Sequence, residues 1–278
     1  MNLKKTIVIT GSNKGIGYAI LERLAKDNKA FEFIMAVRKI SNGEQALSNL
    51  HKSISDIDKR VQIEQLDISN AQSIKDFVSR IDKNYGKVDA LINNAGMAFK
   101  GDTFGPNVVR ETFQTNFFGT VDITEKMQDL INDNGKIITV GSSVGKLRII
   151  QSEELKEILR NPEISKSRLF DFAKLYYAAV ADDTYQQKGL PRQAYAMSKL
   201  LINLYTSYLA KQPQILERNI QVYALCPGWC RTDMAGPRAP LSAEQGAETP
   251  SYLVNLPWRI HPDLQGKFFC DKKITSLE

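Results

Sequence analysis

The chain has 278 residues, of which 42% are hydrophobic and 24% are charged, and its formal net charge at pH 7 is +6. A chain of this length and composition can bury one large core, and we expect a single domain over 1–278. Apolar runs are too short to span a bilayer. The first residues lead directly into a predicted strand, so we expect no signal peptide.

The basic residues are scattered and are not interleaved with aromatic residues, so we expect no nucleic-acid partner. A basic surface around a pocket would instead attract an anionic cofactor. Cys226, Cys230 and Cys270 lack metal or disulfide spacing, which indicates reduced thiols and a cytoplasmic location. His51 and His261 lie far apart in the sequence, which argues against a metal site and against a Ser-His-Asp hydrolase.

The first predicted elements form a dinucleotide-binding site. The β-branched run 5–10 predicts a strand that is buried on both faces, and a helical pattern begins at Tyr18. Gly11, Gly15 and Gly17 lie between them, where they would let a pyrophosphate approach the free N–H groups of the helix. The alternative is a tight turn that binds nothing.

The rest of the chain alternates strand and helix patterns. We expect further strands at 31–37, 61–66, 90–93, 136–140, 220–225 and 266–269. Helices fill the gaps, among them 71–83, which Ser69-Asn70 would cap. This order predicts an α/β, Rossmann-type doubly wound fold, with a mainly parallel seven-stranded sheet and helices on both faces. Ligands of such sheets bind beyond the carboxyl ends of the strands.

Tyr195 and Lys199 place a phenol and an ammonium one helical turn apart. Reduction of a ketone needs a hydride, which a nicotinamide can give, and a proton from a general acid. Free tyrosine titrates near ~10, so we expect the Lys199 cation to lower the pKa of Tyr195 and make it that acid. The alternative is an exposed helix face without chemistry.

Several further motifs accompany the glycine loop and the Tyr195–Lys199 pair along the chain. The set is Thr10-Gly11-x-x-x-Gly15-x-Gly17, Asn93-Asn94-Ala95-Gly96, Thr115-Asn116-Phe117-Phe118-Gly119, Ser142-Ser143, Tyr195-x-x-x-Lys199 and Pro227-Gly228. In this combination, over nearly the whole chain, the sequence resembles the short-chain dehydrogenase/reductase family. Within that family it is most similar to the monomeric NADPH-dependent carbonyl reductases of animal cytosol. The resemblance implies an oxidoreductase that reduces ketones, aldehydes or quinones with NADPH.

The resemblance also implies roles for four catalytic residues. Tyr195 is the general acid, and Lys199 also holds the nicotinamide ribose. Ser143 donates a hydrogen bond to the substrate oxygen as charge develops there. Asn116 holds a water that extends the proton path from Lys199. Ser142 is the rival serine, but the family pattern matches the second serine of the pair.

The end of the second strand predicts the cofactor. Relatives that prefer NAD carry an acidic residue there, whereas this chain offers Arg38, which can bind a 2′-phosphate with two hydrogen bonds. Lys14 would add a second positive charge, and we expect no carboxylate nearby to compete. Asp67 would receive the adenine amine, and Asn94 would contact the adenosine. The expected cofactor contacts are Gly11, Asn13, Lys14, Gly15, Ile16, Gly17, Arg38, Asp67, Ile68, Asn94, Ala95, Gly96, Tyr195, Lys199, Pro227, Gly228, Cys230 and Thr232.

The stretch 144–193 is longer than most relatives need, and we interpret it as a helical insertion. Helical patterns occur around 152–159 and 165–185. In the second of these an apolar stripe shares one face: Leu169, Phe172, Ala173, Tyr176 and Val180. Such a stripe must be buried, and the resemblance implies that it covers the surface that other family members use to associate. We therefore expect a monomer; the alternative is a mobile surface insertion.

The substrate is the least determined feature. We expect it to contact Ser143 and Tyr195, and also Phe99, Trp229 and Met234, the last two within the loop region 227–250. Trp229 could instead only pack that loop. The alternatives are a more specialised ketone reductase, of alkaloid/terpene or steroid/prostaglandin type, and a catalytically silent dinucleotide-binding scaffold. We expect no metal.

Overall fold

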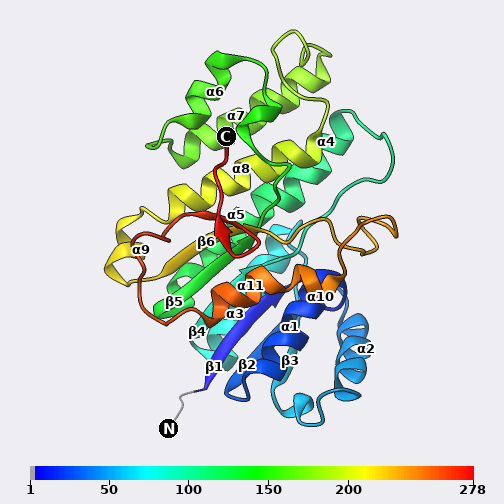
Figure 1. Cartoon of the computed structure of the whole chain (residues 1–278), viewed down its shortest axis with the longest axis vertical. Coiled ribbons are helices and arrows are strands. Elements are labelled where there is room, and N and C mark those ends of the chain that lie inside the picture. Colours follow the sequence, from blue (N-terminus) through cyan, green and yellow to red (C-terminus); the bar gives the residue numbers. More distant parts are fainter. Residues whose placement is uncertain (1–3) are drawn as a thin grey trace.

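The computed structural model describes residues 4–278 of the chain. It contains one sheet, in the strand order β3-β2-β1-β4-β5-β6-β7-β8 (Figure 1). The strands are β1 (Lys5–Thr10), β2 (Phe31–Val37), β3 (Val61–Gln65), β4 (Val88–Asn93), β5 (Ile131–Val140), β6 (Gln221–Cys226), β7 (Phe268–Cys270) and β8 (Lys273–Ile274). Strands β1 to β7 pair in parallel, and β8 runs antiparallel to β7.

Helices connect the strands and cover both faces of the sheet. They are α1 (Gly15–Asp27), α2 (Ile40–His51), α3 (Ala71–Tyr85), α4 (Pro106–Phe113), α5 (Thr120–Met127), α6 (Glu153–Arg160), α7 (Lys166–Ala181), α8 (Ala194–Leu209), α9 (Pro213–Glu217), α10 (Ala243–Gly246) and α11 (Glu248–Asn255). A π-helical turn at Gln114–Gly119 joins α4 to α5, and short 3-10 turns occur at Ile57–Lys59, Gln128–Leu130 and Leu147–Ile149.

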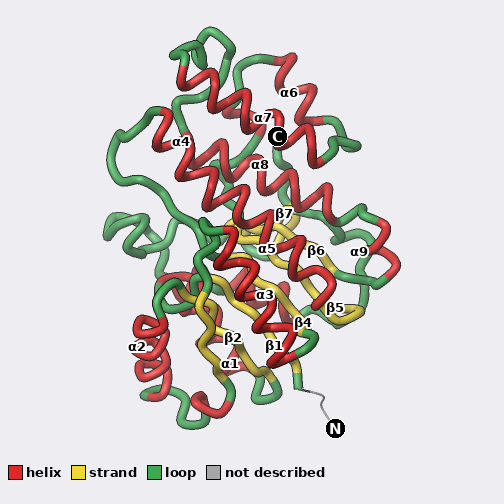
Figure 2. Tube along the Cα trace, turned by 180° about the vertical axis from the view of Figure 1, so that it is seen from behind, coloured by secondary structure: helices red, strands yellow, loops and turns green. Residues whose placement is uncertain are grey.

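The buried strand residues alternate between two hydrophobic clusters. Ile7 and Ile9 of β1 belong to the cluster under α1, α2 and α11, whereas Val8 belongs to the cluster under α3, α5 and α8. Figure 1 shows α1, α10 and α11 in front of the sheet, and Figure 2 shows α3, α5 and α8 in front of the opposite face. Burial on both faces is what a parallel sheet requires. The predicted doubly wound fold is confirmed.

The predicted strands are present, most with bounds that differ by one or two residues, and there are two larger differences. Strand β5 begins at Ile131 rather than at 136, because the residues 132–135 are polar or glycine and hide the strand pattern. The expected count of seven strands was wrong by one, since the two-residue strand β8 is too short to show a period. The predicted cap of α3 is confirmed, because the Asn70 side chain accepts from the Ser73 N–H.

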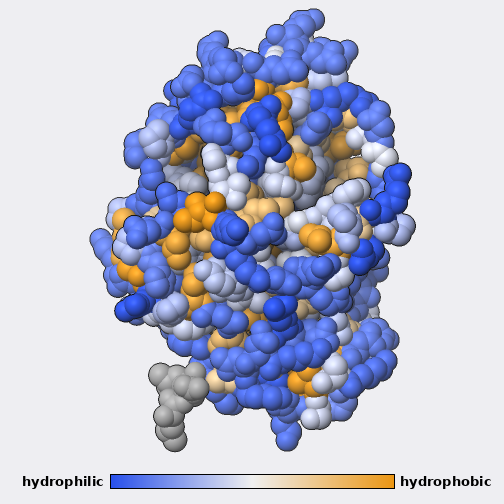
Figure 3. Space-filling view, viewed as in Figure 1, coloured by the Kyte–Doolittle hydropathy of each residue, from blue (hydrophilic) through white to orange (hydrophobic). Residues whose placement is uncertain are grey.

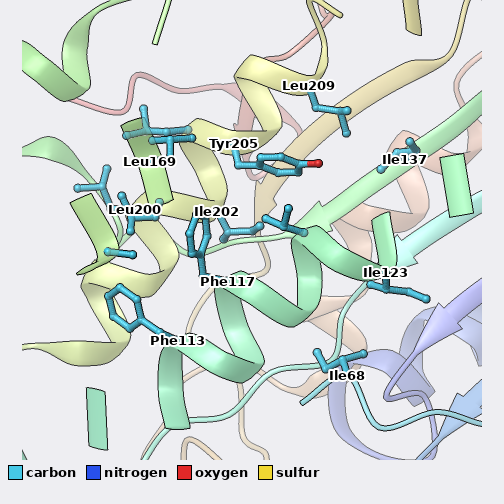
Figure 4. Packing of buried hydrophobic residues seen from close by; sticks show 14 of the residues in the cluster. Ile68, Phe113, Phe117, Ile123, Ile137, Leu169, Leu200, Ile202, Tyr205 and Leu209 are labelled. Atoms are coloured by element: carbon cyan, nitrogen blue, oxygen red, sulfur yellow. The ribbon is translucent and has the colours of Figure 1, made fainter. Parts of the chain in front are cut away.

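The predicted insertion helices are α6 and α7, which Ser152 and Ser165 cap through their hydroxyls. All five residues of the expected apolar stripe on α7 are buried. Figure 4 shows how Leu169 of α7 lies beside Leu200 of α8, with Phe113 at the end of α4 nearby. The rings of Phe113 and Tyr176 stack at 5.6 Å. The insertion therefore packs on the helices that frame the candidate site.

A buried lysine joins β5 to the end of α11. The Lys136 ammonium donates to the carbonyl oxygens of Leu253, Val254 and Leu256, at 3.1, 2.7 and 2.5 Å. It also lies 4.4 Å from the centre of the Trp258 ring. The last carbonyls of a helix have no partner within the helix, so this cation supplies one for three of them.

We expect Lys136→Met to lower the free energy of unfolding by about 2–3 kcal/mol, because it leaves buried carbonyls without donors. Urea denaturation of both proteins measures the difference. Lys126→Met is the control, since Lys126 forms an exposed ion pair with Asp122, and it should change stability by less than about 1 kcal/mol. Equal losses in the two variants would show that the buried contacts of Lys136 do not stabilise the fold.

Candidate active site

One large cavity, of about 1080 Å³, lies at the carboxyl ends of β1, β4, β5 and β6. Figure 3 shows that this face of the molecule is hollowed in its upper half, with hydrophobic surface in and around the hollow. The predicted residues that line the cavity are Gly11, Asn13, Lys14, Gly15, Ile16, Gly17, Arg38, Asp67, Ile68, Asn94, Ala95, Gly96, Ser143, Tyr195, Lys199, Pro227, Gly228, Trp229, Cys230, Thr232 and Met234. The fold therefore gathers motifs separated by more than two hundred residues into one place.

Two predicted residues do not line this cavity. Phe99 lies outside the cavity lining, with 37% of its surface exposed, and its expected contact with the substrate stays a prediction. The chain carries Met97, Ala98 and Lys100 to the cavity instead. Asn116 is buried behind the cavity wall, in the π-helical turn.

The Asn116 side chain links two segments of the site. Its amide group donates to the Met97 carbonyl at 2.8 Å and to the Ser198 hydroxyl at 3.1 Å, and its Oδ1 accepts from the Met97 N–H at 2.8 Å. A Cβ added to Gly96 would lie 3.2 Å from this Oδ1 and 3.7 Å from Lys199 Nζ. Because Gly96 has no side chain, a space remains between Asn116 Oδ1 and Lys199 Nζ.

The glycine loop has the geometry that its sequence predicted. Gly15 adopts φ = +58°, which favours glycine. A Cβ on Gly17 would lie 2.4 Å from the Asn94 amide nitrogen and 2.6 Å from the Gly11 carbonyl oxygen. Asn94 donates to the carbonyls of Thr10 and Gly11 at 2.8 and 3.2 Å. Its side-chain amide therefore holds the loop in place, and the expected contact of Asn94 with the adenosine stays a prediction.

The expected environment of the 2′-phosphate needs one correction. Arg38 is exposed and lines the cavity, as the interpretation requires. Lys14, however, forms a 2.7 Å ion pair with Asp233, a residue of the loop after β6. A carboxylate therefore does compete for this cation, contrary to the expectation. Asp67 also lines the cavity, and its Oδ1 accepts from the backbone N–H and the hydroxyl of Ser69.

Burial dominates the acid–base properties of the Tyr–Lys pair. It raises the pKa of Tyr195 to about 12, with a further rise from Cys226, while a hydrogen bond with Ser142 lowers it. Burial also lowers the pKa of Lys199 to about 8. The Lys199 ammonium lies 5.7 Å from the centre of the Tyr195 ring and donates to the Val140 carbonyl at 2.8 Å. The pKa of Tyr195 is therefore raised rather than lowered, contrary to the expectation, because burial of the phenol penalises its charged form.

The two candidate serines have different neighbours. Ser142 contacts the Tyr195 phenol and accepts from the Val144 N–H at 3.3 Å. Ser143 accepts from the Cys226 thiol at 3.4 Å. Both line the cavity. The choice of Ser143 as the serine that contacts the substrate stays a prediction.

Sequence reasoning missed two residues that hold the site together. The Thr10 hydroxyl accepts from the N–H groups of Asn94 and Ala95, which joins the ends of β1 and β4. Asp233 pairs with Lys14 of the glycine loop. It directly follows Thr232, an expected cofactor contact, and a charged residue at that place could have indicated a role in the site. Within residues 4–278, no helix is long and apolar enough to cross a membrane, and no cluster of three His, Cys, Asp or Glu residues could hold a metal.

The lysine pKa predicts how reduction depends on pH. If Lys199 acts as a cation, kcat/KM should be constant at low pH and fall as the pH rises through about 8, where the ammonium loses its proton. Tyr195 remains protonated until about pH 12 and adds no second step at lower pH. The profile should be measured with NADPH at fixed ionic strength. Lys199→Met should be slow and lack this step, and a wild-type profile that stays level well above pH 8 would contradict the assignment.

Comparisons with known proteins agree with this geometry. A family model described as short chain dehydrogenase matches residues 5–153. Carbonyl reductase (NADPH) 1 of Mus musculus is 35% identical over 277 residues and covers 96% of each chain. The Homo sapiens protein of the same name is 34% identical over 279 residues and covers 97% of each chain.

Solved structures show the same relationship. Salutaridine reductase from Papaver somniferum has a TM-score of 0.84 at 26% identity, and the match covers 96% of this chain and 100% of that chain. Menthone neomenthol reductase from Mentha piperita has a TM-score of 0.80 at 25% identity, with coverage of 96% and 98%. This chain therefore belongs to the short-chain dehydrogenase/reductase family.

Proposed function

We propose that this protein is an NADPH-dependent carbonyl reductase that acts on ketones, aldehydes or quinones. The observation that carries the proposal is the convergence of the glycine loop with Tyr195 and Lys199 on one cavity. The names of the mouse and human relatives support both the cofactor and the reaction class.

The residues present fit a phosphorylated dinucleotide. The cavity is large enough for the cofactor and a substrate together, and the glycine loop exposes backbone N–H groups at the start of α1. Arg38 and Lys14 supply two cations at the end of β2 and in the loop. When bound there, NADPH would supply the hydride.

The side chains of this protein would supply the proton and the charge stabilisation. Tyr195, which is protonated at neutral pH, donates its phenolic proton to the substrate oxygen as charge develops there. Lys199 stabilises the phenolate that forms, and Ser143 donates a hydrogen bond to the same substrate oxygen. In this proposal, Asn116 contributes through its Oδ1, which faces the space beside Gly96 where a water would link it to Lys199.

A second candidate is a more specialised ketone reductase. The similarity to salutaridine reductase and to menthone neomenthol reductase favours it, because both structures match nearly all of this chain. Trp229 and Met234 line the cavity and are 57% and 41% exposed, so they offer apolar surface to a large substrate. A silent dinucleotide-binding scaffold is disfavoured because Ser143, Tyr195 and Lys199 all meet at the cavity.

A screen of NADPH consumption separates these functions. The panel should contain quinones, aromatic aldehydes, simple ketones, and bulky terpene, alkaloid and steroid ketones. Turnover of many members supports the carbonyl reductase, and turnover of one structural class alone supports the specialised enzyme. NADPH binding without turnover of any member would contradict the proposal.

We also infer that the protein works as a monomer. Support comes from the insertion, whose apolar face on α7 is buried against α4 and α8 within the same chain. Light scattering should therefore report a mass near the 31.3 kDa of one chain at micromolar concentration. A stable dimer or tetramer would show that the insertion leaves an association surface open.

A cytoplasmic location is part of the same proposal. All three cysteines are free thiols, which suits a reducing compartment. The expected partner is a small carbonyl compound, with no role for nucleic acid or a membrane. Fractionation of cells that express the tagged protein tests the location, and recovery in a membrane or secreted fraction would contradict it.

A further inference from the structure

Two cysteines face each other where β6 and β7 end. Cys226 and Cys270 are register partners, and each is the last residue of its strand. Register partners on adjacent parallel strands project to the same face, and these two pack in one small cluster with Ala224 and Phe268. Neighbouring strands lie about 4.8 Å apart, within the Cα separation of about 4.4–6.8 Å that a disulfide requires.

The two thiols differ in what they can reach. Cys226 is buried, lines the active-site cavity, and donates to the Ser143 hydroxyl at 3.4 Å. Its sulfur also accepts from the Gly228 N–H at 3.3 Å. Cys270 is partly exposed and lies outside the cavity lining. The pair therefore connects the protein surface to Ser143 in the cavity.

We propose that Cys226 and Cys270 form a reversible disulfide that inhibits the enzyme when a hydroperoxide oxidises it. The Cys270 thiolate attacks hydrogen peroxide, so that a sulfur–oxygen bond forms, the O–O bond breaks, and one water leaves after protonation. The Cys226 thiolate then attacks the Cys270 sulfur; a disulfide bond forms and a second water leaves. The two thiols lose two electrons in total, and the peroxide is reduced to water.

The disulfide would act on the site through Cys226. Its thiol hydrogen is lost, so the hydrogen bond to Ser143 is lost as well. The Cys226 sulfur also accepts from the Gly228 N–H, so a disulfide at this sulfur would disturb a contact of the segment that lines the cofactor cavity. Burial raises the pKa of Cys270, so oxidation should quicken as the pH rises. This loss of activity rests on the proposed function, whereas formation of the disulfide does not.

The test treats the purified full-length protein with hydrogen peroxide and then with dithiothreitol. Peptide mapping without reductant should find Cys226 linked to Cys270, and reductase activity should fall by more than half and return with dithiothreitol. Cys270→Ser should form no such link and should keep its activity through the same treatment. Cys230→Ser is the control for the linkage alone and should still form it.

Three results would overturn the proposal. They are absence of the Cys226–Cys270 peptide, equal inactivation of Cys270→Ser, and full activity of the linked protein. If the protein reduces no carbonyl compound, the peptide map still tests the thiol pair, so failure of the proposed function and failure of this inference are distinguishable.

Discussion

Tyr195→Phe should reduce kcat for ketone reduction by about 10²–10⁴-fold while NADPH binding changes little. The variant keeps the ring and loses only the hydroxyl, so it removes the proton donor without opening a large cavity. Steady-state kinetics with a ketone or aldehyde measure the loss, because reduction of simple quinones depends less on protonation. Calorimetric titration with NADPH measures whether the variant still binds the cofactor with its normal affinity.

Tyr208→Phe is the matched control for this variant. Tyr208 lies on α8 like Tyr195 but does not line the active-site cavity. It should therefore keep nearly normal turnover. Near-normal ketone reduction by Tyr195→Phe would show that Tyr195 is not the general acid. Loss of cofactor binding would show that the substitution disturbs the structure of the cofactor site.

Arg38→Ala should reduce the preference for NADPH over NADH by about 10- to 150-fold. A hydrogen bond to a charged group contributes roughly 1.5–3 kcal/mol, and NADH lacks the phosphate that Arg38 would bind. The measurement is kcat/KM for both cofactors in the wild type and the variant. Lys14 would keep part of the preference, so the double variant of Arg38 and Lys14 should lose more than either single variant.

Two further variants make this test specific. Lys39→Ala removes an exposed cation that does not line the cavity, and it should leave the preference unchanged. Asp233→Asn removes the carboxylate that pairs with Lys14, and it should strengthen NADPH binding more than NADH binding. Equal weakening of both cofactors by Arg38→Ala, or a wild type that prefers NADH, would contradict the assignment of the phosphate site.

Most of the fold could be predicted because its signals are local. The strands that are buried on both faces contain continuous apolar runs, as in 33–37, and the cap at Asn70 has a short-range pattern. Gly11 and Gly15 adopt positive φ angles, and a side chain on Gly17 would clash with Asn94 and Gly11. Glycine is therefore required at these positions, and the sequence shows it directly. These signals placed the cavity at the correct edge of the sheet.

The misses concern contacts between distant segments and the balance of opposing energies. The Lys14–Asp233 ion pair joins residues 219 positions apart, and no local pattern encodes it. Phe99 shares a segment with Gly96 but does not line the cavity, because the direction of its side chain depends on the whole fold. Its expected contact with the substrate stays a prediction. The pKa of Tyr195 is raised chiefly by burial, and the burial of this side chain becomes visible only when the fold is known.

Transfer of deuterium from NADPH labelled at its hydride position tests the central claim most directly. The wild-type protein should place the label on the carbinol carbon of the alcohol that it forms from a ketone, and Tyr195→Phe should form this labelled product far more slowly. An unlabelled alcohol, or product formation that does not depend on Tyr195, would contradict the account.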